Sequence, residues 1–171
     1  MSRVRSFPPL AAPRCRVLVL GTMPGRESLR QRQYYAHPRN AFWPIMAAFA
    51  GFAVDAPYAE RAAALVAAGI AVWDVLQSCD RPGSLDSAID PATLRPNDFR
   101  RFFREHPQVT TICCNGATAE RLFRRHVLAA DEGLQRLHCV RLPGTSPAHA
   151  ALGLPAKQRA WHAALRTALA R

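Results

Sequence analysis

Four short apolar runs, spread over the whole chain, constrain its fold more than any other feature. Each run is rich in β-branched residues or cysteine, and most end at Gly, Asn or Pro. Runs of this length and composition predict buried strands with loops at their carboxyl ends. They are residues 15–21, 70–76, 109–116 and 138–144.

Helical patterns fill the intervals between these runs. They show the 3.6-residue amphipathic period, or begin at Pro or Asn and stop at Gly. Strands that alternate with helices predict an α/β fold with a parallel sheet covered on both faces. A chain of 171 residues suits a single domain, residues 1–171. The predicted helices are residues 40–51, 57–69, 95–107, 116–130 and 155–170.

The most unusual residues lie in the loops that follow the predicted strands. Residues 33–43, QYYAHPRNAFW, combine rings with His, Arg and Asn, which suits neither a surface helix nor a core strand. Because ligands bind outside the carboxyl ends of parallel strands, we expect this stretch to line a site. The other loops expected at that edge are residues 21–28, 77–89, 115–120 and 143–150.

Charge points to a polyanionic partner. The chain has 23 Lys plus Arg against 12 Asp plus Glu, a net charge of +11. Lys157 is the only lysine, so coding bias explains the preference for Arg over Lys. Coding bias explains less well why basic residues outnumber acidic ones. As the polyanionic partner, nucleic acid is favoured ahead of a membrane surface. No apolar run approaches the roughly 18 residues of a membrane span, and we see no signal peptide.

The five cysteines predict buried free thiols in a reducing cytoplasm. Their number is odd and no two are spaced as C-x-x-C, which argues against a disulfide framework and against a Zn or Fe–S site. The six histidines form no H-E-x-x-H pair. We therefore expect no metal and no cofactor.

Acidic residues are scarce in the expected site. The turn at residues 21–28 and the loop at residues 37–40 contain only Glu27 as an acid, and no Ser lies in a G-x-S-x-G motif. We therefore expect little general-base power at this edge, and no hydrolysis by an activated nucleophile.

Six sequence blocks in order resemble one known family. They are LGTMPGRESL, QYYAHPRNAFW, GIAVWDVLQSCDRPGSLDSAI, NDFRRFFREHP, ICCNGATAERLF and LPGTSPAHA. Together they resemble the hypoxanthine-DNA (deoxyinosine) glycosylases, a branch of the uracil-DNA glycosylase superfamily. The resemblance runs from about Phe7 to about His149. It implies a three-layer α/β/α domain with a central four-stranded parallel sheet, and release of hypoxanthine from DNA to leave an abasic site.

The same resemblance assigns site residues. It makes Asn40 the catalytic residue, since a neutral amide can accept from water and donate to a developing charge. It makes Asn115 a base-reading residue. From the residues alone, Asn40 could instead cap a helix and Asn115 could cap a strand end. The other base-binding residues are expected to be Gly21, Thr22, Met23, Pro24, Gly25, Tyr35 and Phe42. The loop residues expected to face the DNA backbone or groove are His37, Arg39, Gly144, Thr145, Ser146, Pro147 and His149.

Three residues depart from the pattern of the family. Cys114 stands where an aromatic residue is usual, His149 where Asn is usual, and Thr22 where Ser is frequent. None of them removes a residue to which the resemblance assigns catalysis. The change at His149 affects the loop that faces DNA.

The expected partner is DNA that contains a deaminated base. We expect the protein to act as a monomer and to bind neither a membrane nor a metal. We expect a cytoplasmic, bacterial protein that meets the nucleoid through DNA. Two alternatives stay open at this point. One is a mismatch-type glycosylase that acts on uracil or thymine opposite guanine, and the other is a catalytically silent protein that only binds DNA or RNA.

Overall fold

A four-stranded parallel sheet forms the centre of the computed structural model, which describes residues 3–171. Its strands are β2 (Val17–Gly21), β3 (Ile70–Asp74), β6 (Thr111–Asn115) and β7 (His138–Leu142), in the order β3-β2-β6-β7. All neighbouring pairs are parallel. The four predicted strands and their parallel arrangement are therefore confirmed.

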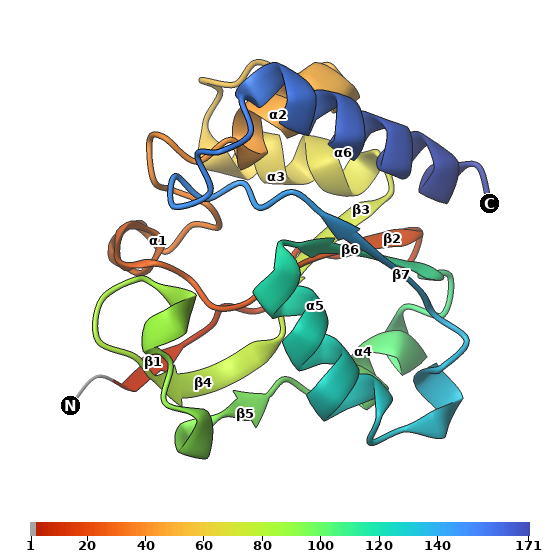
Figure 1. Cartoon of the computed structure of the whole chain (residues 1–171). Coiled ribbons are helices and arrows are strands. Elements are labelled where there is room, and N and C mark those ends of the chain that lie inside the picture. Colours follow the sequence, from red (N-terminus) through yellow and green to blue (C-terminus); the bar gives the residue numbers. More distant parts are fainter. Residues whose placement is uncertain (1–2) are drawn as a thin grey trace.

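Helices cover both faces of this sheet (Figure 1). On one face lie α2 (Phe42–Ala50), α3 (Tyr58–Ala67) and α6 (Leu154–Leu169), of which α6 contacts three of the strands. On the other face lie α4 (Phe99–Glu105) and α5 (Ala117–Phe123). The predicted three-layer α/β/α architecture is confirmed.

Local sequence signals explain several helix ends. Asp98 caps α4 by accepting from the Arg101 amide, and Gly51 ends α2 in the left-handed conformation. The pattern over residues 116–130 begins as α5 and ends in one π-helical segment, η3 (Arg124–Leu128). A short helix, α1 (Arg26–Gln31), was not expected, because a single polar turn and a half carries no apolar period.

A second, smaller sheet was not expected from the sequence either. It is antiparallel and orders its strands as β1 (Arg3–Arg5), β4 (Leu76–Asp80) and β5 (Arg95–Pro96). The chain leaves the parallel sheet after Asp74 and enters the small sheet two residues later, at Leu76. The apolar run 70–76 therefore contributes residues to both sheets. The loop after β4 returns to the carboxyl edge of the parallel sheet.

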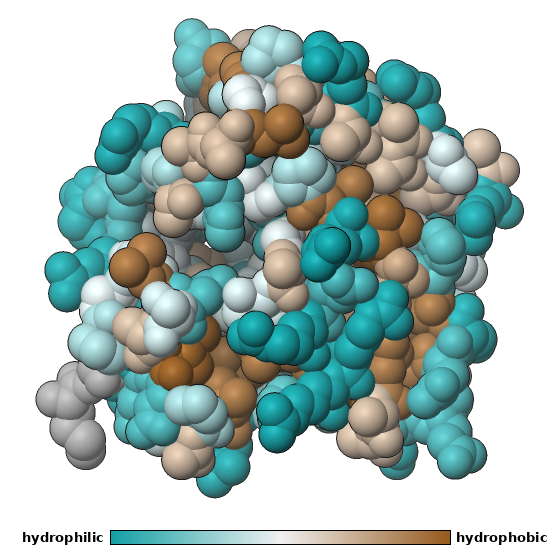
Figure 2. Space-filling model, viewed as in Figure 1, coloured by the Kyte–Doolittle hydropathy of each residue, from teal (hydrophilic) through white to brown (hydrophobic). Residues whose placement is uncertain are grey.

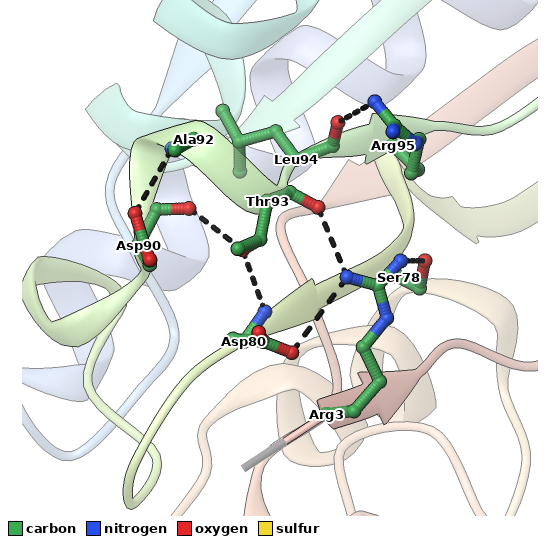
Figure 3. Close-up of polar contacts among 8 residues, drawn as sticks. All are labelled: Arg3, Ser78, Asp80, Asp90, Ala92, Thr93, Leu94 and Arg95. Carbon is green, nitrogen blue, oxygen red and sulfur yellow. Dashed lines mark hydrogen bonds and ion pairs between the residues drawn. The ribbon is translucent and has the colours of Figure 1, made fainter. Parts of the chain in front are cut away.

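Polar contacts fix the ends of that loop (Figure 3). The Arg3 guanidinium donates to the Ser78 hydroxyl at 2.8 Å and to the Thr93 carbonyl at 3.3 Å. It also lies 3.6 Å from an Asp80 carboxyl oxygen. The Thr93 hydroxyl accepts from the Asp80 amide at 2.8 Å and donates to the Asp90 carbonyl at 2.8 Å. Residues 81–90 are thus held between fixed points, with two 3₁₀ turns, η1 (Asp86–Ala88) and η2 (Pro91–Thr93), within or next to them.

The core lies between the sheet and its two helical layers. Cys15, Cys79, Cys113 and Cys114 are buried and free, and Cys139 is half-buried and free, as the sequence predicts. The helices of the described part of the chain include none long and apolar enough to cross a bilayer. A third 3₁₀ turn, η4 (Glu132–Leu134), leads into β7.

Trp161 joins the core to the loop after β7. Its side chain is fully buried on α6, and its indole N–H donates to the Pro143 carbonyl at 2.9 Å. Trp161→Phe keeps most of the apolar volume but leaves that carbonyl without its donor. We expect it to lower the free energy of unfolding by about 1–3 kcal/mol. Trp161→Ala should lower it by about 3–5 kcal/mol through loss of packing. Urea unfolding of both variants measures this, and a Trp161→Phe variant as stable as wild type would contradict a role for the indole N–H.

Candidate active site

A cavity of about 740 Å³ opens at the carboxyl ends of β2, β3 and β6. Figure 2 shows the molecule hollowed on this face, with hydrophilic and intermediate residues around the opening. A cavity of this size lies in the range of small-molecule sites. Its lining includes, from the residues that the sequence singled out, Gly21, Thr22, Met23, Pro24, Gly25, Tyr35, His37, Arg39, Asn40, Asn115, Gly144, Thr145, Ser146, Pro147 and His149.

A buried arginine holds the first wall, the turn that follows β2. The Arg81 side chain is 1% exposed and donates to the Met23 carbonyl at 3.4 Å and to the Gly83 carbonyl at 3.1 Å. It also donates to the Pro24 carbonyl. The Ser84 hydroxyl accepts from the Arg26 amide at 2.9 Å, at the start of α1. The small sheet thus fixes this turn through the loop after β4.

Two aromatic residues anchor the second wall, residues 33–43. The buried Tyr34 hydroxyl donates to the Pro8 carbonyl at 2.9 Å, and the Trp43 indole donates to the Tyr34 carbonyl at 2.8 Å. Between these anchors, Tyr35 takes the left-handed conformation with φ of 55°, which is uncommon for a bulky residue. The anchors therefore impose the backbone turn that sends Tyr35 into the cavity.

Phe42 lies behind the cavity instead of lining it. Its ring is fully buried and stacks on the Tyr35 ring, with centroids 4.0 Å apart. Contact between Phe42 and a bound base, as expected from the sequence, does not fit this position. The ring instead supports Tyr35 from the side away from the cavity.

Asn40 both lines the cavity and caps a helix. Its side-chain oxygen accepts from the Phe42 amide at 2.9 Å at the start of α2, and its backbone N–H donates to the His37 carbonyl at 2.9 Å. The next residue, Ala41, donates its amide to the Thr145 carbonyl at 2.9 Å. The capping contact identifies the oxygen of the Asn40 amide and so fixes the direction of its NH₂ group.

Asn115 is locked by Thr145 on the facing loop. The Thr145 amide donates to the Asn115 side-chain oxygen at 2.9 Å, and the Asn115 NH₂ donates to the Thr145 hydroxyl at 2.9 Å. Thr145 itself is 1% exposed. One N–H and one lone pair of the Asn115 amide remain for a ligand.

The loop after β7 is held from α6 as well as from Asn115. The Lys157 ammonium donates to the His149 carbonyl at 2.7 Å. Lys157, the single lysine of the sequence, is buried. The His149 ring lies over the bare Cα of Gly144, where a Cβ would come within 2.6 Å of it. His149 and Arg39 are exposed at the rim and His37 is half-buried there. The rim therefore offers cationic or hydrogen-bonding side chains to a ligand larger than the cavity.

Three carboxyl groups line the cavity, those of Glu27, Asp74 and Asp86, which corrects the expectation of an edge with Glu27 as its only acid. Asp74 ends β3 and Asp86 lies in η1. Burial, followed by the charge of Asp86, raises the pKa of Asp74 to about 7. Burial also raises the pKa of Asp86. Asp74 and Asp86 lie outside residues 21–28 and 37–40, and the signal for Asp74 in the sequence is an acid inside the apolar run 70–76.

Glu27, the one acid expected near the site, lines the cavity but is already paired within α1. Its carboxylate pairs with Arg30 on the exposed surface of α1, and this pairing lowers the pKa of Glu27 to about 2. Within residues 3–171, no three His, Cys, Asp or Glu side chains come together in a group able to hold a metal ion.

The fold and the cavity define a three-layer α/β/α ligand-binding domain with its site at the carboxyl ends of the parallel strands. The chain belongs to the Uracil DNA glycosylase superfamily, whose sequence model matches residues 8–166.

Curated relatives and a solved structure support this membership. A Hypoxanthine DNA glycosylase of Methanosarcina acetivorans is 34% identical over 116 residues, which cover 67% of this chain and 72% of the relative. One of Methanosarcina barkeri is 32% identical over 113 residues, covering 66% and 70%. A solution NMR structure from Methanosarcina acetivorans, described as a candidate uracil DNA glycosylase, has a TM-score of 0.79 at 29% identity and covers 97% of this chain and 98% of its own. These relatives are archaeal and give no support to a bacterial source.

The Asn115–Thr145 contact should contribute measurably to stability. Asn115→Ala leaves the buried Thr145 amide and hydroxyl without their partner, so we expect the free energy of unfolding to fall by about 1–3 kcal/mol. Thr118→Ala is the matched control, because Thr118 lines the same cavity and its hydroxyl makes no hydrogen bond within residues 3–171. The control should change the value by about 0.5 kcal/mol or less. Thermal and urea unfolding compare the two, and equal losses would contradict the locking role of Asn115.

Proposed function

We propose that this protein is a single-domain DNA glycosylase that releases hypoxanthine from DNA and leaves an abasic site. The observation that carries the proposal is the pair of oriented amides, Asn40 and Asn115, that face one cavity at the carboxyl edge of the sheet. The names of the two curated relatives supply the base. The substrate is DNA with a deaminated adenine.

The reaction requires that the damaged nucleotide leave the duplex. A base inside the stack is out of reach, so it must rotate into the cavity before its glycosidic bond breaks. The cationic rim, with Arg39 and the loop from Gly144 to Pro147, meets the phosphates on either side. The net charge of +11 favours this encounter.

The chemistry needs positioned groups more than a strong nucleophile. As the bond between the sugar carbon and the base nitrogen breaks, its electron pair stays on the base and positive charge builds on the sugar. Water then adds to that carbon, and the proton it loses ends on the departed base. Asn40 lies where its amide positions this water, since one lone pair of its oxygen is free beside the helix-capping contact.

Asn115 is assigned to the base. Its locked amide presents one N–H and one lone pair to the cavity, and the Thr145 contact prevents it from rotating to suit a different edge. Tyr35, backed by Phe42, supplies an aromatic wall. The turn from Gly21 to Gly25 closes the opposite side with backbone groups.

We also propose that the protein acts as a monomer, without a metal or cofactor, in the cytoplasm where it meets DNA. The buried free thiols are consistent with a reducing compartment.

A panel of damaged duplexes tests the substrate. Labelled duplexes carrying hypoxanthine, uracil, xanthine or thymine opposite guanine are incubated with excess protein and cleaved with alkali at abasic sites. We expect the fastest single-turnover release from hypoxanthine. Uracil is included because the NMR structure is described as that of a candidate uracil enzyme. Faster release of uracil or thymine would replace the proposed substrate, and binding without any release would make the protein a silent DNA binder.

Asn40 variants separate catalysis from helix capping. Asn40→Ala should lose about 10²-fold or more in single-turnover release of hypoxanthine, because it removes a preorganised group. It should also lose about 0.5–2 kcal/mol of stability with the cap. Asn40→Ser keeps a capping oxygen, so it should melt close to wild type and still lose the activity. An active Asn40→Ser variant would contradict the catalytic assignment.

A further inference from the structure

Asp74 is a buried acid without a partner inside the cavity. It is 3% exposed, and its Oδ2 atom is buried with no hydrogen-bond donor among the described residues. The neighbouring Asn97 amide donates to the Asp74 backbone carbonyl, at 2.8 Å, and not to its carboxyl group. A buried polar group left without a partner costs stability, so its presence in a ligand cavity points to a contact that the ligand completes.

A second unpartnered oxygen lies beside it. The Tyr35 hydroxyl is buried and also has no partner within residues 3–171. A Cβ on Gly21 would lie 2.5 Å from Asp74 Oδ1 and 2.8 Å from the Tyr35 hydroxyl oxygen. Both groups therefore pack against the bare Cα of Gly21, and only glycine leaves them room.

The strand order places these groups in a row with Asn115. Gly21 is paired with Asp74 on one side, and on the other side Leu20 is paired with Cys114, the residue before Asn115. Neighbouring strands are about 4.8 Å apart. The backbones of Asp74 on β3 and Asn115 on β6 are therefore separated by about two strand spacings, and the Tyr35 hydroxyl lies over β2 between them. The row forms a polar floor that matches the edge of a flat heterocycle.

The charged groups near Asp74 favour its neutral form. Asp86 faces it from η1 and raises its pKa, after burial, to about 7, whereas Arg81 acts in the opposite direction. Arg81 makes no ion pair with Asp74, because its N–H groups donate to backbone carbonyls. Tyr34 and Tyr35 also lie close, and burial, followed by the charge of Asp74, raises the pKa of both hydroxyls. His149 at the rim and Arg121 on α5 act on Asp86 in the lowering direction.

We propose that Asp74, in its protonated form, binds the lactam edge of the extruded base, donating to the carbonyl oxygen and accepting from the adjacent N–H. The inference rests on the proposed function and names a residue that recognises the base and assists its release. A neutral carboxyl group offers one donor beside one acceptor, which complements the carbonyl and N–H of hypoxanthine. An ionised Asp74 offers acceptors only and faces the carbonyl with a negative charge.

The donated hydrogen bond strengthens as the base leaves. The electron pair of the breaking glycosidic bond spreads onto the carbonyl oxygen of the base, so a donor placed there stabilises the transition state more than the bound substrate. A carboxylic acid that stays neutral near pH 7 in an apolar site is a known way to supply such a donor. Asn115 keeps one N–H and one lone pair for the base after its contact with Thr145, and Asp74 adds a second donor at the carbonyl oxygen, which has two lone pairs.

Release rates across pH test the proposal. Single-turnover release of hypoxanthine from duplex is measured from pH 5 to 9 for wild type, Asp74→Asn and Asp74→Ala. The wild-type rate should fall towards tenfold per pH unit above the pKa of Asp74. Asp74→Asn keeps a donor and an acceptor without titrating, so its rate should lose this alkaline decline and exceed that of wild type at pH 9. Asp74→Ala should lose about 10²-fold at pH 6.

Asp55→Asn is the matched control, because Asp55 is exposed and lies outside the cavity. It should keep the wild-type rate and pH profile. Asp86→Asn gives a signed test, since removing a like charge lowers the pKa of Asp74 and should move the alkaline decline to lower pH. An Asp74→Asn variant that keeps the wild-type decline, or an Asp74→Ala variant with the wild-type rate, would overturn the proposal.

Thermal melts provide a readout that does not depend on activity. The pKa of Asp74 is raised in the folded state from 3.8 to about 7, so wild type loses stability as pH rises through this range. Asp74→Asn should melt above wild type, with a difference that opens between pH 4 and 7 and then stays constant. A lower melting temperature at all pH values would indicate a purely structural Asp74 and would overturn the proposal. If wild type releases no hypoxanthine while the melts behave as expected, the proposed function is wrong, but the conclusion that Asp74 is buried in its neutral form still holds.

Discussion

The hydrogen-bonded register of β2 with its two neighbours is the constraint on which the site depends. β2 pairs in parallel with β3 and with β6, so that Gly21, Asp74 and Asn115 end side by side. A shift of one residue in either pairing would move every side chain of that strand to the opposite face. Because the strand interiors are fully buried, the apolar core fixes the register, and the register fixes the polar floor.

Backbone contacts then orient the polar groups of the cavity. Asn40 is fixed by the start of α2 and Asn115 by Thr145, while the buried Arg81 holds the turn after β2. Each contact uses a group that folding must satisfy in any case, a helix amide or a turn carbonyl. The same interactions therefore stabilise the fold and preorganise the site, which limits the reorganisation needed when a base enters.

Other groups in the cavity are left unsatisfied, at a cost to stability. The Asp74 carboxyl and the Tyr35 hydroxyl lack partners, and Tyr35 also has a positive φ. Strain and unpaired polar atoms of this kind persist where the surrounding structure over-determines them, and they gather at functional sites. The stacking of Phe42 on Tyr35 and the anchors at Tyr34 and Trp43 supply that surrounding structure.

Sequence patterns alone predict the parallel sheet, its helical layers and the edge that carries the site. Apolar runs and amphipathic periods are local signals, and the carboxyl edge follows from the topology. The sequence also identifies most of the residues that line the cavity, through the ordered blocks of residues 21–28, 33–43, 115–120 and 143–150. Three features emerge only from the folded chain: Phe42 lies behind Tyr35, β4 belongs to a second sheet, and Asp74 is a buried acid at the floor of the cavity. These depend on contacts between residues far apart in the chain, such as Arg81 with the turn after β2, and no local pattern encodes such contacts.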